Sequence, residues 1–534
     1  MLPRHTRGLG LGSTDDPSLR APRRRPSAAP DPARTVEAPH ATPAQARRYG
    51  GRGASVARPR QGELAGGGRG MVHPLTDRAA NERLRAYDAR VRAAYDAIVP
   101  TLKAVSAMQH EPDFESRAQQ LAAAELGFEL PDHILADAWV GQLDLRSLYA
   151  WCVFKTYRRL ADEFFGQDPL GGFADQGFES FLLDCGFHRL DLSPCADGRL
   201  AHTVSYVLRL PFGSVKRRSY AGALFDVEDT VAQWVEVELA RFREGRPSTA
   251  DAPTRYLKAV VYHRSSRDPA HQGCAAHGSD DARAAAAGLE RLQAFQQAVQ
   301  NSFCCGASVD LLLIGLDTDT DAIQIHVPDQ SGHIDLDRSV DALEAYRLTL
   351  GLDPQAARTR ILQLVRDAAP EAPSEGMSRL VARLIESNIS QIDCVRTWFG
   401  GQYPDAGHAE RFIGTGIGFD EIQLRNLTYF AYLTTVEEGA TDLDVGLRIF
   451  GGLNVSRGLP VPVVIRFDYR GAVPGARERA VAHCNRVHGA LMARYPELAR
   501  DGLLHTLRAV RDSEGTGSIE FVGCSLQKQQ AGGH

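Results

Sequence analysis

The feature that most constrains this chain of 534 residues is a strand-like run that ends in three functional side chains. Residues 187–192 form a short apolar-alternating run, and Cys195, Asp197 and Arg199 follow after a Ser-Pro pair. In extended backbone, alternate residues point to the same side, so we expect the thiol, the carboxylate and the guanidinium to converge. They would converge beyond the carboxyl end of a strand, where open α/β sheets hold their ligands.

A second strand-like run supplies the partners that a metal site needs. Residues 258–263, KAVVYH, are β-branched and aromatic and end in His263, and Cys274 follows eleven residues later. The Ala-rich stretch 281–299, which we expect to be helical, comes next. Cys195, His263 and Cys274 form a Cys₂His set with one open position, the arrangement of a catalytic rather than a structural zinc site.

Two alternatives stay open at this site. His271, in H-x-x-C spacing with Cys274, is a rival ligand, but we favour His263 because a strand fixes its direction and His271 follows in a loop. If Asp197 or His271 supplied a fourth ligand, the site would be closed. The protein would then be a zinc-stabilised scaffold rather than an enzyme.

The cysteine content points to metal binding or free thiols. Nine cysteines, an odd number, in a chain whose first residues lack an apolar secretory segment argue against a disulfide framework. The adjacent Cys304 and Cys305 leave a thiol redox protein as a further alternative, although neighbouring cysteines rarely form a relaxed disulfide. Because no apolar run reaches about 18 residues, we expect no membrane span. Because the first residues lack the apolar segment of a secretory signal, we expect a protein inside the cell.

Charge is divided unevenly along the chain. Residues 1–70 hold thirteen Arg, no Lys and five acidic residues, a net charge of +8 that leaves −13 for the rest of the chain. This segment is rich in Pro, Gly and Ala and has too few large apolar residues to offset chain entropy, so we expect a disordered arm. An acidic protein partner fits it better than nucleic acid, because the arm lacks interleaved aromatic residues and the body is acidic.

The pattern beyond the arm predicts a helical region and then an α/β region. Residues 76–166 carry apolar positions at helical spacing, in a first run that ends at Pro100. From residue 171 we expect alternation of strands and helices, including an alternating run at 203–210 and an amphipathic helix at 228–243. Helices are expected again at 334–398.

An acidic segment separates two further predicted strands, 309–316 and 322–327. Asp317–Asp321 could suggest a calcium loop, but it lacks the glycine and the terminal glutamate of an EF-hand. We interpret this segment as a solvated hairpin turn.

The C-terminal part echoes the zinc-binding part but lacks its chemistry. Gly414–Gly418, GTGIG, is interpreted as a boundary, and the strand at 460–467 resembles the His263 strand with Phe467 in the histidine's place. RIFGGLNVSRG, residues 448–458, stands where a counterpart of Cys195 is expected. The helix at 476–494 and the strand at 518–523 complete the repeat. The cluster of Cys484 with His483 and His488 is interpreted as accidental.

We therefore expect one zinc per chain and a degenerate second copy that packs on the first, extends its sheet and covers its edge. The expected domains are an arm at 1–70, a helical domain at 71–170, a zinc-binding domain at 171–415 and the second copy at 416–534.

These residues resemble a known family. C-x-D-x-R followed by a strand-end His and a later Cys resembles the β-class carbonic anhydrases, although eight extra residues separate His263 from Cys274 here. The stretches 262–281, 301–321 and the terminal GSIEFVG are similar to the carboxysomal shell carbonic anhydrase family, a divergent branch once called the ε class. The resemblance runs from about residue 75 to the C-terminus.

The resemblance implies a function for each part of the site. The fold would be α/β (α+β), with a β-carbonic-anhydrase-like domain duplicated in one chain behind the helical domain and the arm. A zinc-bound hydroxide would attack CO₂ to give bicarbonate, Asp197 would accept a hydrogen bond from the bound water, and Arg199 would hold Asp197 off the metal in a bidentate pair. His277 is a candidate proton shuttle.

The resemblance also implies a place in the cell and a set of partners. The enzyme would reside in the carboxysome and convert bicarbonate to CO₂ for Rubisco. Its arm would bind Rubisco or a shell protein, and the protein would be a homo-oligomer, a dimer or a multiple of dimers, without membrane contact.

Removing the arm should separate docking from catalysis. A chain that begins at Met71 should keep its hydration activity, because no site residue lies in the arm, but should lose capture by an acidic partner such as Rubisco. Capture by the full chain should weaken steeply as salt screens the +8 charge of the arm, which binding assays across ionic strength would measure. A truncated chain that binds and co-localises like the full chain would contradict this expectation.

Overall fold

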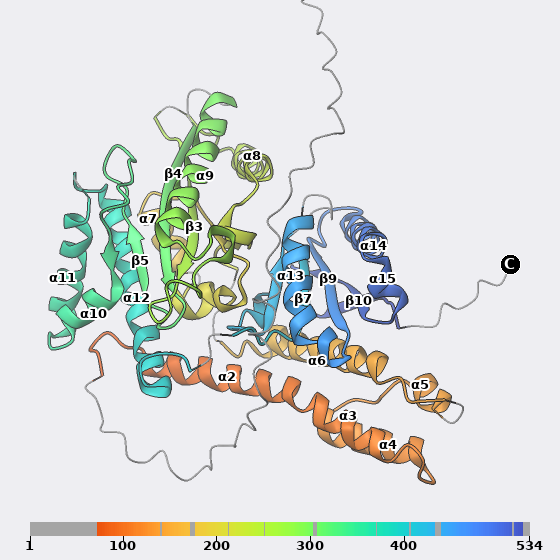
Figure 1. Cartoon of the computed structure of the whole chain (residues 1–534). Coiled ribbons are helices and arrows are strands. Elements are labelled where there is room, and N and C mark those ends of the chain that lie inside the picture. Colours follow the sequence, from red (N-terminus) through yellow and green to blue (C-terminus); the bar gives the residue numbers. More distant parts are fainter. Residues whose placement is uncertain are drawn as a thin grey trace, which may run out of the picture. The chain divides into compact units, whose positions relative to one another are not determined.

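The computed structural model describes residues 72–526 except 139–140, 171–176, 212, 250, 303–306, 370, 405–406, 433–438 and 515–516. The expected arm and the Cys304–Cys305 pair lie outside the described residues. Along the described chain, a helical region comes first, and two sheets with their covering helices follow (Figure 1). None of the described helices is both long enough and apolar enough to cross a membrane.

The helical region forms as its apolar spacing predicts. Asp77 caps the first helix by accepting a hydrogen bond from the backbone of Ala80, and the apolar residues at three- and four-residue steps are buried. Pro100 does not end a helix, because it lies in the first turn of the next one, where its missing N–H has no helical partner to lose. The helices are α2 (Arg78–Asp96), α3 (Ile98–Ala107), α4 (Phe114–Leu126), α5 (Asp132–Asp137) and α6 (Leu145–Gln167).

The first sheet has the strand order β2-β1-β3-β4-β5-β6. The pairs β2–β1, β1–β3 and β3–β4 are parallel, and β4–β5 and β5–β6 are antiparallel. The central strand β3 is buried along nearly its whole length, as the apolar run from Ala259 to Tyr262 within it indicates. The strands are β1 (Arg189–Pro194), β2 (Lys216–Arg217), β3 (Thr254–Arg264), β4 (Ala307–Asp317), β5 (Ile323–His326) and β6 (Val340–Asp341).

Helices cover this sheet and follow it in the chain. Helix α9 packs on β3 and β4, and α8 packs on α9. The expectation of helices over 334–398 is met by three that pack on one another and against β5. The helices of this part are α7 (Gly177–Asp184), α8 (Val227–Arg243), α9 (Asp281–Ser302), α10 (Ala342–Thr349), α11 (Pro354–Asp367) and α12 (Glu375–Phe399).

The second sheet repeats the first. Its order is β8-β7-β9-β10-β11, with three parallel pairs followed by one antiparallel pair, the same directions as along β2-β1-β3-β4-β5 in the first sheet. Helix α14 packs on β9 and β10 as α9 packs on β3 and β4. The elements are β7 (Phe412–Ile417), β8 (Thr428–Ala431), α13 (Ala440–Leu453), β9 (Val461–Tyr469), α14 (Ala476–Arg494), α15 (Pro496–Arg500), β10 (Leu504–Asp512) and β11 (Ile519–Cys524).

The glycine-rich GTGIG segment is a strand, not a boundary. It forms most of β7, and the register that pairs Gly416 with Arg466 makes Gly416 the counterpart of Cys195. Gly416 has φ +112°, and a Cβ there would overlap the Arg466 carbonyl oxygen, so only glycine fits. The stretch 448–458, expected to hold the counterpart of Cys195, lies instead in α13 and the short turn that follows it.

The alternating run at 203–210 is also not a strand. Residues Thr203–Val207 form a π-helical turn, η2, in which all but Ser205 are buried. A short apolar run with no exposed face carries no usable periodicity, because strand and buried helix predict the same burial.

The expectation that the second sheet extends the first is wrong. The two sheets share no strand pairing among the described residues. The halves meet through loops and side chains: the rings of Tyr220 and Tyr432 lie 5.7 Å apart, and the Ala221 N–H donates to Asp442 at 3.0 Å. The helical region packs on the second sheet through α6, and the Tyr157 hydroxyl lies 2.7 Å from Arg466 Nη1.

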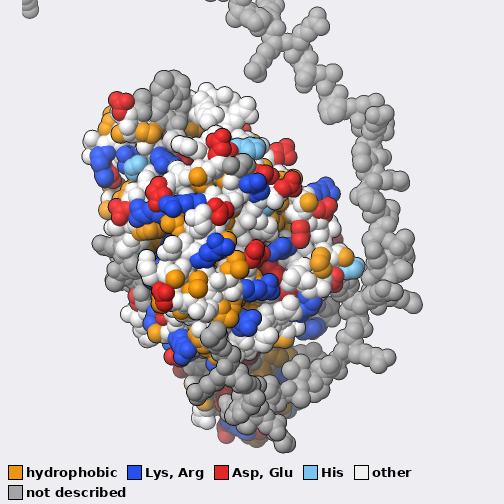
Figure 2. Space-filling model, turned by 90° about the vertical axis from the view of Figure 1, so that its left-hand side faces the viewer, with side chains coloured by type: hydrophobic (Ala, Val, Ile, Leu, Met, Phe, Trp, Pro, Cys, Tyr) orange, Lys and Arg blue, Asp and Glu red, His pale blue; other side chains and the backbone are white. Residues whose placement is uncertain are grey.

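Surface charge is mixed on the side of the molecule that lies at the left of Figure 1. Figure 2 shows that acidic and basic side chains alternate on this face among apolar and neutral ones. On the described part of this face, the net charge of −13 beyond the arm is therefore not gathered into one acidic patch.

Deleting residues 412–534 should cause aggregation rather than leave a soluble half. The helical region and the second sheet share one hydrophobic cluster, in which Phe154 and Leu160 are buried with Phe412 and Val464. Removal of the sheet would expose that apolar surface, which size-exclusion chromatography with light scattering would detect. A matched truncation after residue 526 should stay soluble, whereas a stable, active fragment ending before β7 would show that the second half is not needed for packing.

Candidate metal centre

The pairing of β1 with β3 brings the first two predicted ligands to one edge of the sheet. These strands are parallel and in a register that sets Pro194 beside Val261, and the Cys195 N–H donates to the Val261 carbonyl at 3.0 Å. Cys195 and His263 therefore lie at neighbouring carboxyl ends, where the sequence placed them. Cys274 precedes a short 3₁₀ turn, η4 (Ala275–His277), rather than the long helix itself.

The structure brings Cys195, His263 and Cys274 together in one buried group. One donor atom of each lies within 4.8 Å of the others, and the two sulfurs are 4.0 Å apart. Among the described residues this is the only group of three or more His, Cys, Asp or Glu side chains that could hold a metal ion. The hydrogen bond between the two thiols, together with burial, raises the pKa of Cys195. The same hydrogen bond lowers the pKa of Cys274 and outweighs burial, which would raise it.

The donor set fits a tetrahedral zinc ion. Zn–S bonds of about 2.3 Å at a tetrahedral angle separate two thiolate sulfurs by about 3.8 Å, close to the observed spacing. His263 is 1% exposed and its Nδ1 has no hydrogen-bond partner in the part of the chain that the structure describes. This is a costly arrangement for a buried imidazole unless something else satisfies it. These residues could hold a metal with three protein ligands.

The rival ligand His271 lies apart from this group. Its side chain is 79% exposed, and its Nδ1 lies 2.9 Å from Asp268 Oδ1. The difference follows from the backbone, since β3 holds His263 at the sheet edge whereas His271 belongs to the loop beyond it.

Asp197 and Arg199 form the bidentate pair that the sequence suggested, but on a different backbone. Arg199 Nε donates to Asp197 Oδ1 at 3.0 Å and Nη2 donates to Oδ2 at 2.8 Å. The chain is not extended here: Asp197 caps a 3₁₀ turn, η1 (Gly198–Leu200), by accepting from the Arg199 N–H at 2.9 Å. The juxtaposition therefore comes from a capped turn rather than from strand alternation.

The pair keeps Asp197 ionised beside Cys195, His263 and Cys274, which we call the metal group. Burial would raise the pKa of Asp197, but the Arg199 guanidinium outweighs it and holds that pKa well below its ordinary value. Asp197 Oδ2 lies 3.8 Å from His263 Nε2, so a carboxylate oxygen faces the group of predicted ligands.

Two groups that sequence reasoning missed hold Arg199 in place. Its Nη1 donates to the Gln272 carbonyl at 2.8 Å and to Thr318 Oγ1 at 3.3 Å. Gln272 lies two residues before Cys274, so Arg199 also fixes the loop that carries that cysteine. The position of Thr318 directly after β4, at the carboxyl edge of the sheet, was the signal that could have found it.

The acidic segment Asp317–Asp321 is buried, which corrects our interpretation of it as a solvated turn. All five residues are at most 9% exposed. Asp317 and Asp319 accept hydrogen bonds from the segment that follows His263, including the Ser266 N–H and the Ser265 hydroxyl. The acidic residues thus cap backbone that leaves the sheet next to the metal group, and buried carboxylates need such donors.

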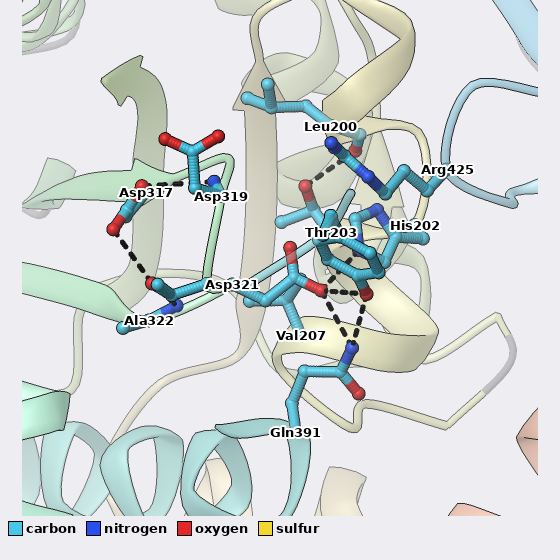
Figure 3. Close-up of polar contacts among 12 residues, drawn as sticks. Leu200, His202, Thr203, Val207, Asp317, Asp319, Asp321, Ala322, Gln391 and Arg425 are labelled. Carbon is cyan, nitrogen blue, oxygen red and sulfur yellow. Dashed lines mark hydrogen bonds and ion pairs between the residues drawn. The ribbon is translucent and has the colours of Figure 1, made fainter. Parts of the chain in front are cut away.

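Asp321 ends this turn at a further buried polar cluster. Figure 3 shows the side chains of His202 and Gln391 pointing at Asp321, with Arg425 beside them. His202 Nε2 and Gln391 Nε2 each lie 2.7 Å from Asp321 Oδ2, and the Tyr403 hydroxyl donates to the same oxygen at 2.8 Å. The cluster joins the η1–η2 segment to α12.

His277 is less accessible than its suggested role as a proton shuttle requires. The residue is 5% exposed, and its Nε2 lies 3.1 Å from the Gly222 carbonyl oxygen. A group that exchanges protons with solvent has to reach solvent, so this burial argues against that role.

The corresponding place in the second half is filled by a salt-bridge network. Phe467, in the place of His263, stacks on His483 with ring centroids 4.2 Å apart. The fully buried Arg466 guanidinium binds Glu421 at 2.6 Å and Asp468 at 2.7 Å. We call the turn that Asp197 caps, residues 197–200, the dyad turn. Gly418 is the counterpart of Asp197, and a Cβ on Gly418 would lie 2.5 Å from Arg466 Nη2. The guanidinium therefore occupies the space beside the counterpart of the dyad turn.

The duplicated sheet with one buried Cys₂His group, compatible with a metal ion, beside an Asp–Arg pair is the arrangement that the sequence resemblance to the carbonic anhydrase class predicts. Comparison with protein families identifies the branch. Models described as the N-terminal, catalytic and C-terminal parts of the Carboxysome Shell Carbonic Anhydrase match residues 73–165, 177–408 and 409–526. The chain therefore belongs to the carboxysome shell carbonic anhydrase family.

Curated relatives agree over most of the chain. A protein of Prochlorococcus marinus (strain MIT 9313) is 60% identical over 86% of this chain and 90% of its own length. One of Parasynechococcus marenigrum (strain WH8102) is 60% identical over 85% of this chain and 79% of its own length. One of Halothiobacillus neapolitanus is 45% identical over 84% of this chain and 90% of its own length. Each is named carboxysome shell carbonic anhydrase.

Proposed function

We propose that this carbonic anhydrase hydrates CO₂ reversibly with one zinc ion held by Cys195, His263 and Cys274. The observation that carries the proposal is a buried Cys₂His group with a single restrained carboxylate, Asp197, at its side. When bound, zinc would supply a Lewis acid that lowers the pKa of a coordinated water to near neutrality.

Asp197 and Arg199 would orient the reactants. Asp197 Oδ2 faces the metal group and keeps lone pairs that the single Nη2 bond does not use, so it can accept a hydrogen bond from a water molecule there. Arg199 would prevent Asp197 from becoming a fourth ligand, because both carboxylate oxygens are tied to its planar fork. With Gln272 and Thr318 binding the same guanidinium, Asp197 cannot turn without breaking several hydrogen bonds.

The closed scaffold is the weaker alternative. It needs a fourth protein ligand, but His271 is exposed and bound to Asp268, and Asp197 is held by Arg199. No other His, Cys, Asp or Glu of the described chain joins the group. The open position favours catalysis.

The cellular role follows from the family. Because the relatives are named for the carboxysome shell, we infer that this enzyme works in the carboxysome and converts bicarbonate to CO₂ for Rubisco. The basic arm at 1–70 would dock on Rubisco or on a shell protein, and we expect a homo-oligomer, either a dimer or a multiple of dimers.

Removing any one ligand should remove the metal. Cys195→Ala, His263→Ala and Cys274→Ala should each lose zinc and activity, because each side chain would supply one direct bond. Metal analysis should give one zinc per wild-type chain, and stopped-flow assays should measure its CO₂ hydration activity. His271→Ala is the matched control and should keep both. The assignment is wrong if His271→Ala strips the zinc while His263→Ala keeps it.

Removing Arg199 should lower the activity without removing the zinc. Arg199→Ala should keep zinc but lose about 10- to 100-fold in kcat/KM, because a freed Asp197 could enter the coordination shell. Spectra of the cobalt-substituted variant would show the added carboxylate. The kcat/KM of Arg199→Lys should fall by a similar factor, since an ammonium cannot hold both carboxylate oxygens of Asp197. The double variant Arg199→Ala with Asp197→Asn should show no added carboxylate, and full activity of Arg199→Ala would refute the mechanism.

A further inference from the structure

A histidine at the junction of the two halves has the contacts of a proton carrier. His408 lies between α12 and β7, and its side chain is 41% exposed. Its Nδ1 is 2.9 Å from Glu410 Oε1, which leaves Nε2 on the far side of the ring. Neither His277, which is buried, nor His271, which is bound to Asp268, combines solvent access with a buried carboxylate in this way.

Glu410 ties this histidine to the dyad turn. Its side chain is completely buried and packs against Gly198, the residue between Asp197 and Arg199. A methyl group on Gly198 would overlap the Glu410 carboxylate, so the contact is as close as the backbone permits. Glu410 Oε2 has no hydrogen-bond partner among the described residues.

Asn426, from the second half, fastens both segments. Its backbone N–H donates to the Gly198 carbonyl at 2.8 Å, and its side-chain amide donates to the Gly407 carbonyl at 2.9 Å. Asn426 is left-handed, with φ +53°, a conformation that asparagine tolerates better than most residues. The same residue thus holds the turn that carries Asp197 and the segment that carries His408.

The groups around His408 raise its pKa. Burial would lower its pKa, but the hydrogen bond and charge of Glu410 outweigh it, Asp197 raises the pKa further, and Arg199 opposes. His408 in turn lowers the pKa of Asp197, so the two groups are close enough to interact. A partly exposed histidine can accept a proton and release it to buffer.

We propose that His408 carries the proton of the reaction between the site and solvent, and that Glu410 and Asn426 position it. The inference rests on the proposed function. Hydration of CO₂ by water yields bicarbonate and one proton. The Nε2 lone pair of neutral His408 takes that proton, and the Nδ1–H stays bonded to Glu410. The resulting imidazolium then returns the proton from Nε2 to a buffer base, and dehydration runs the same steps in reverse.

The proposal also gives the second half a part in turnover. It has no metal group among its described residues, yet its Asn426 would fix the position of the proton carrier. Such a role is one of positioning, since Asn426 touches neither the predicted ligands nor the Asp197 side chain in any contact described.

The decisive experiment separates proton transfer from CO₂ hydration. In His408→Ala, kcat at low buffer concentration should fall about tenfold or more, whereas kcat/KM, which does not include the proton step, should stay within about twofold. Added imidazole buffer should restore kcat. Oxygen-18 exchange should show unchanged CO₂–bicarbonate interconversion and slowed release of labelled water. Zinc content and thermal melting should match the wild type.

Two further variants test the positioning residues. Glu410→Gln keeps a hydrogen bond but removes the charge that raises the His408 pKa, so the pH profile of kcat should shift to lower pH. Asn426→Gly keeps the left-handed backbone and the bond to Gly198 but loses the bond to Gly407. It should lower kcat at low buffer with kcat/KM retained, and imidazole should rescue it.

His271→Ala is the matched control, an exposed histidine that should keep kcat at low buffer. The proposal is overturned if His408→Ala keeps its kcat at low buffer, or if it loses kcat and kcat/KM together without rescue by imidazole. Wild-type protein with zinc bound but no CO₂ hydration would refute the proposed function itself, before any variant is compared.

Discussion

The bonding of one arginine, Arg199, holds the site together. Its guanidinium binds Asp197, the Gln272 carbonyl and Thr318, so three loops from three strands of the first sheet meet on one side chain. Because the group is buried and each bond is charge-assisted, releasing any partner would leave an unpaired polar group inside the protein. The Cys274 loop, the dyad turn and the acidic turn after β4 therefore keep a single arrangement.

The second half also has a buried arginine, Arg466, but this one lies in a buried ionic cluster instead of beside a metal group. Arg466 binds Glu421 and Asp468 and fills the place where the first half has its metal group. A buried arginine needs carboxylates around it. Duplication of the sheet therefore did not duplicate the Cys₂His group among the described residues: the shared order of five strands supports a group that could hold a metal in one half and a buried ionic cluster in the other.

Sequence reasoning found the parts of the site that local pattern determines. The β-branched strand ending in His263 and the C-x-D-x-R segment after β1 were legible because strand ends and short motifs involve neighbouring residues. Errors arose where burial came from distant residues. The GTGIG segment was interpreted as a boundary because nothing local shows that the Arg466 backbone lies against Gly416. The acidic turn looked solvated because its donors come from the segment after β3.

The sequence by itself determined the duplicated α/β architecture and the residues that could bind a metal. Only the tertiary structure decided which of them meet. The parallel register of β1 and β3 sets Cys195 beside His263 and leaves His271 in solvent. Packing of the second half against the first brings Asn426 to Gly198 and sets the Glu410 side chain against the same turn. Such contacts join residues hundreds of positions apart, and periodicity, which reports only on near neighbours along the chain, carries no information about them.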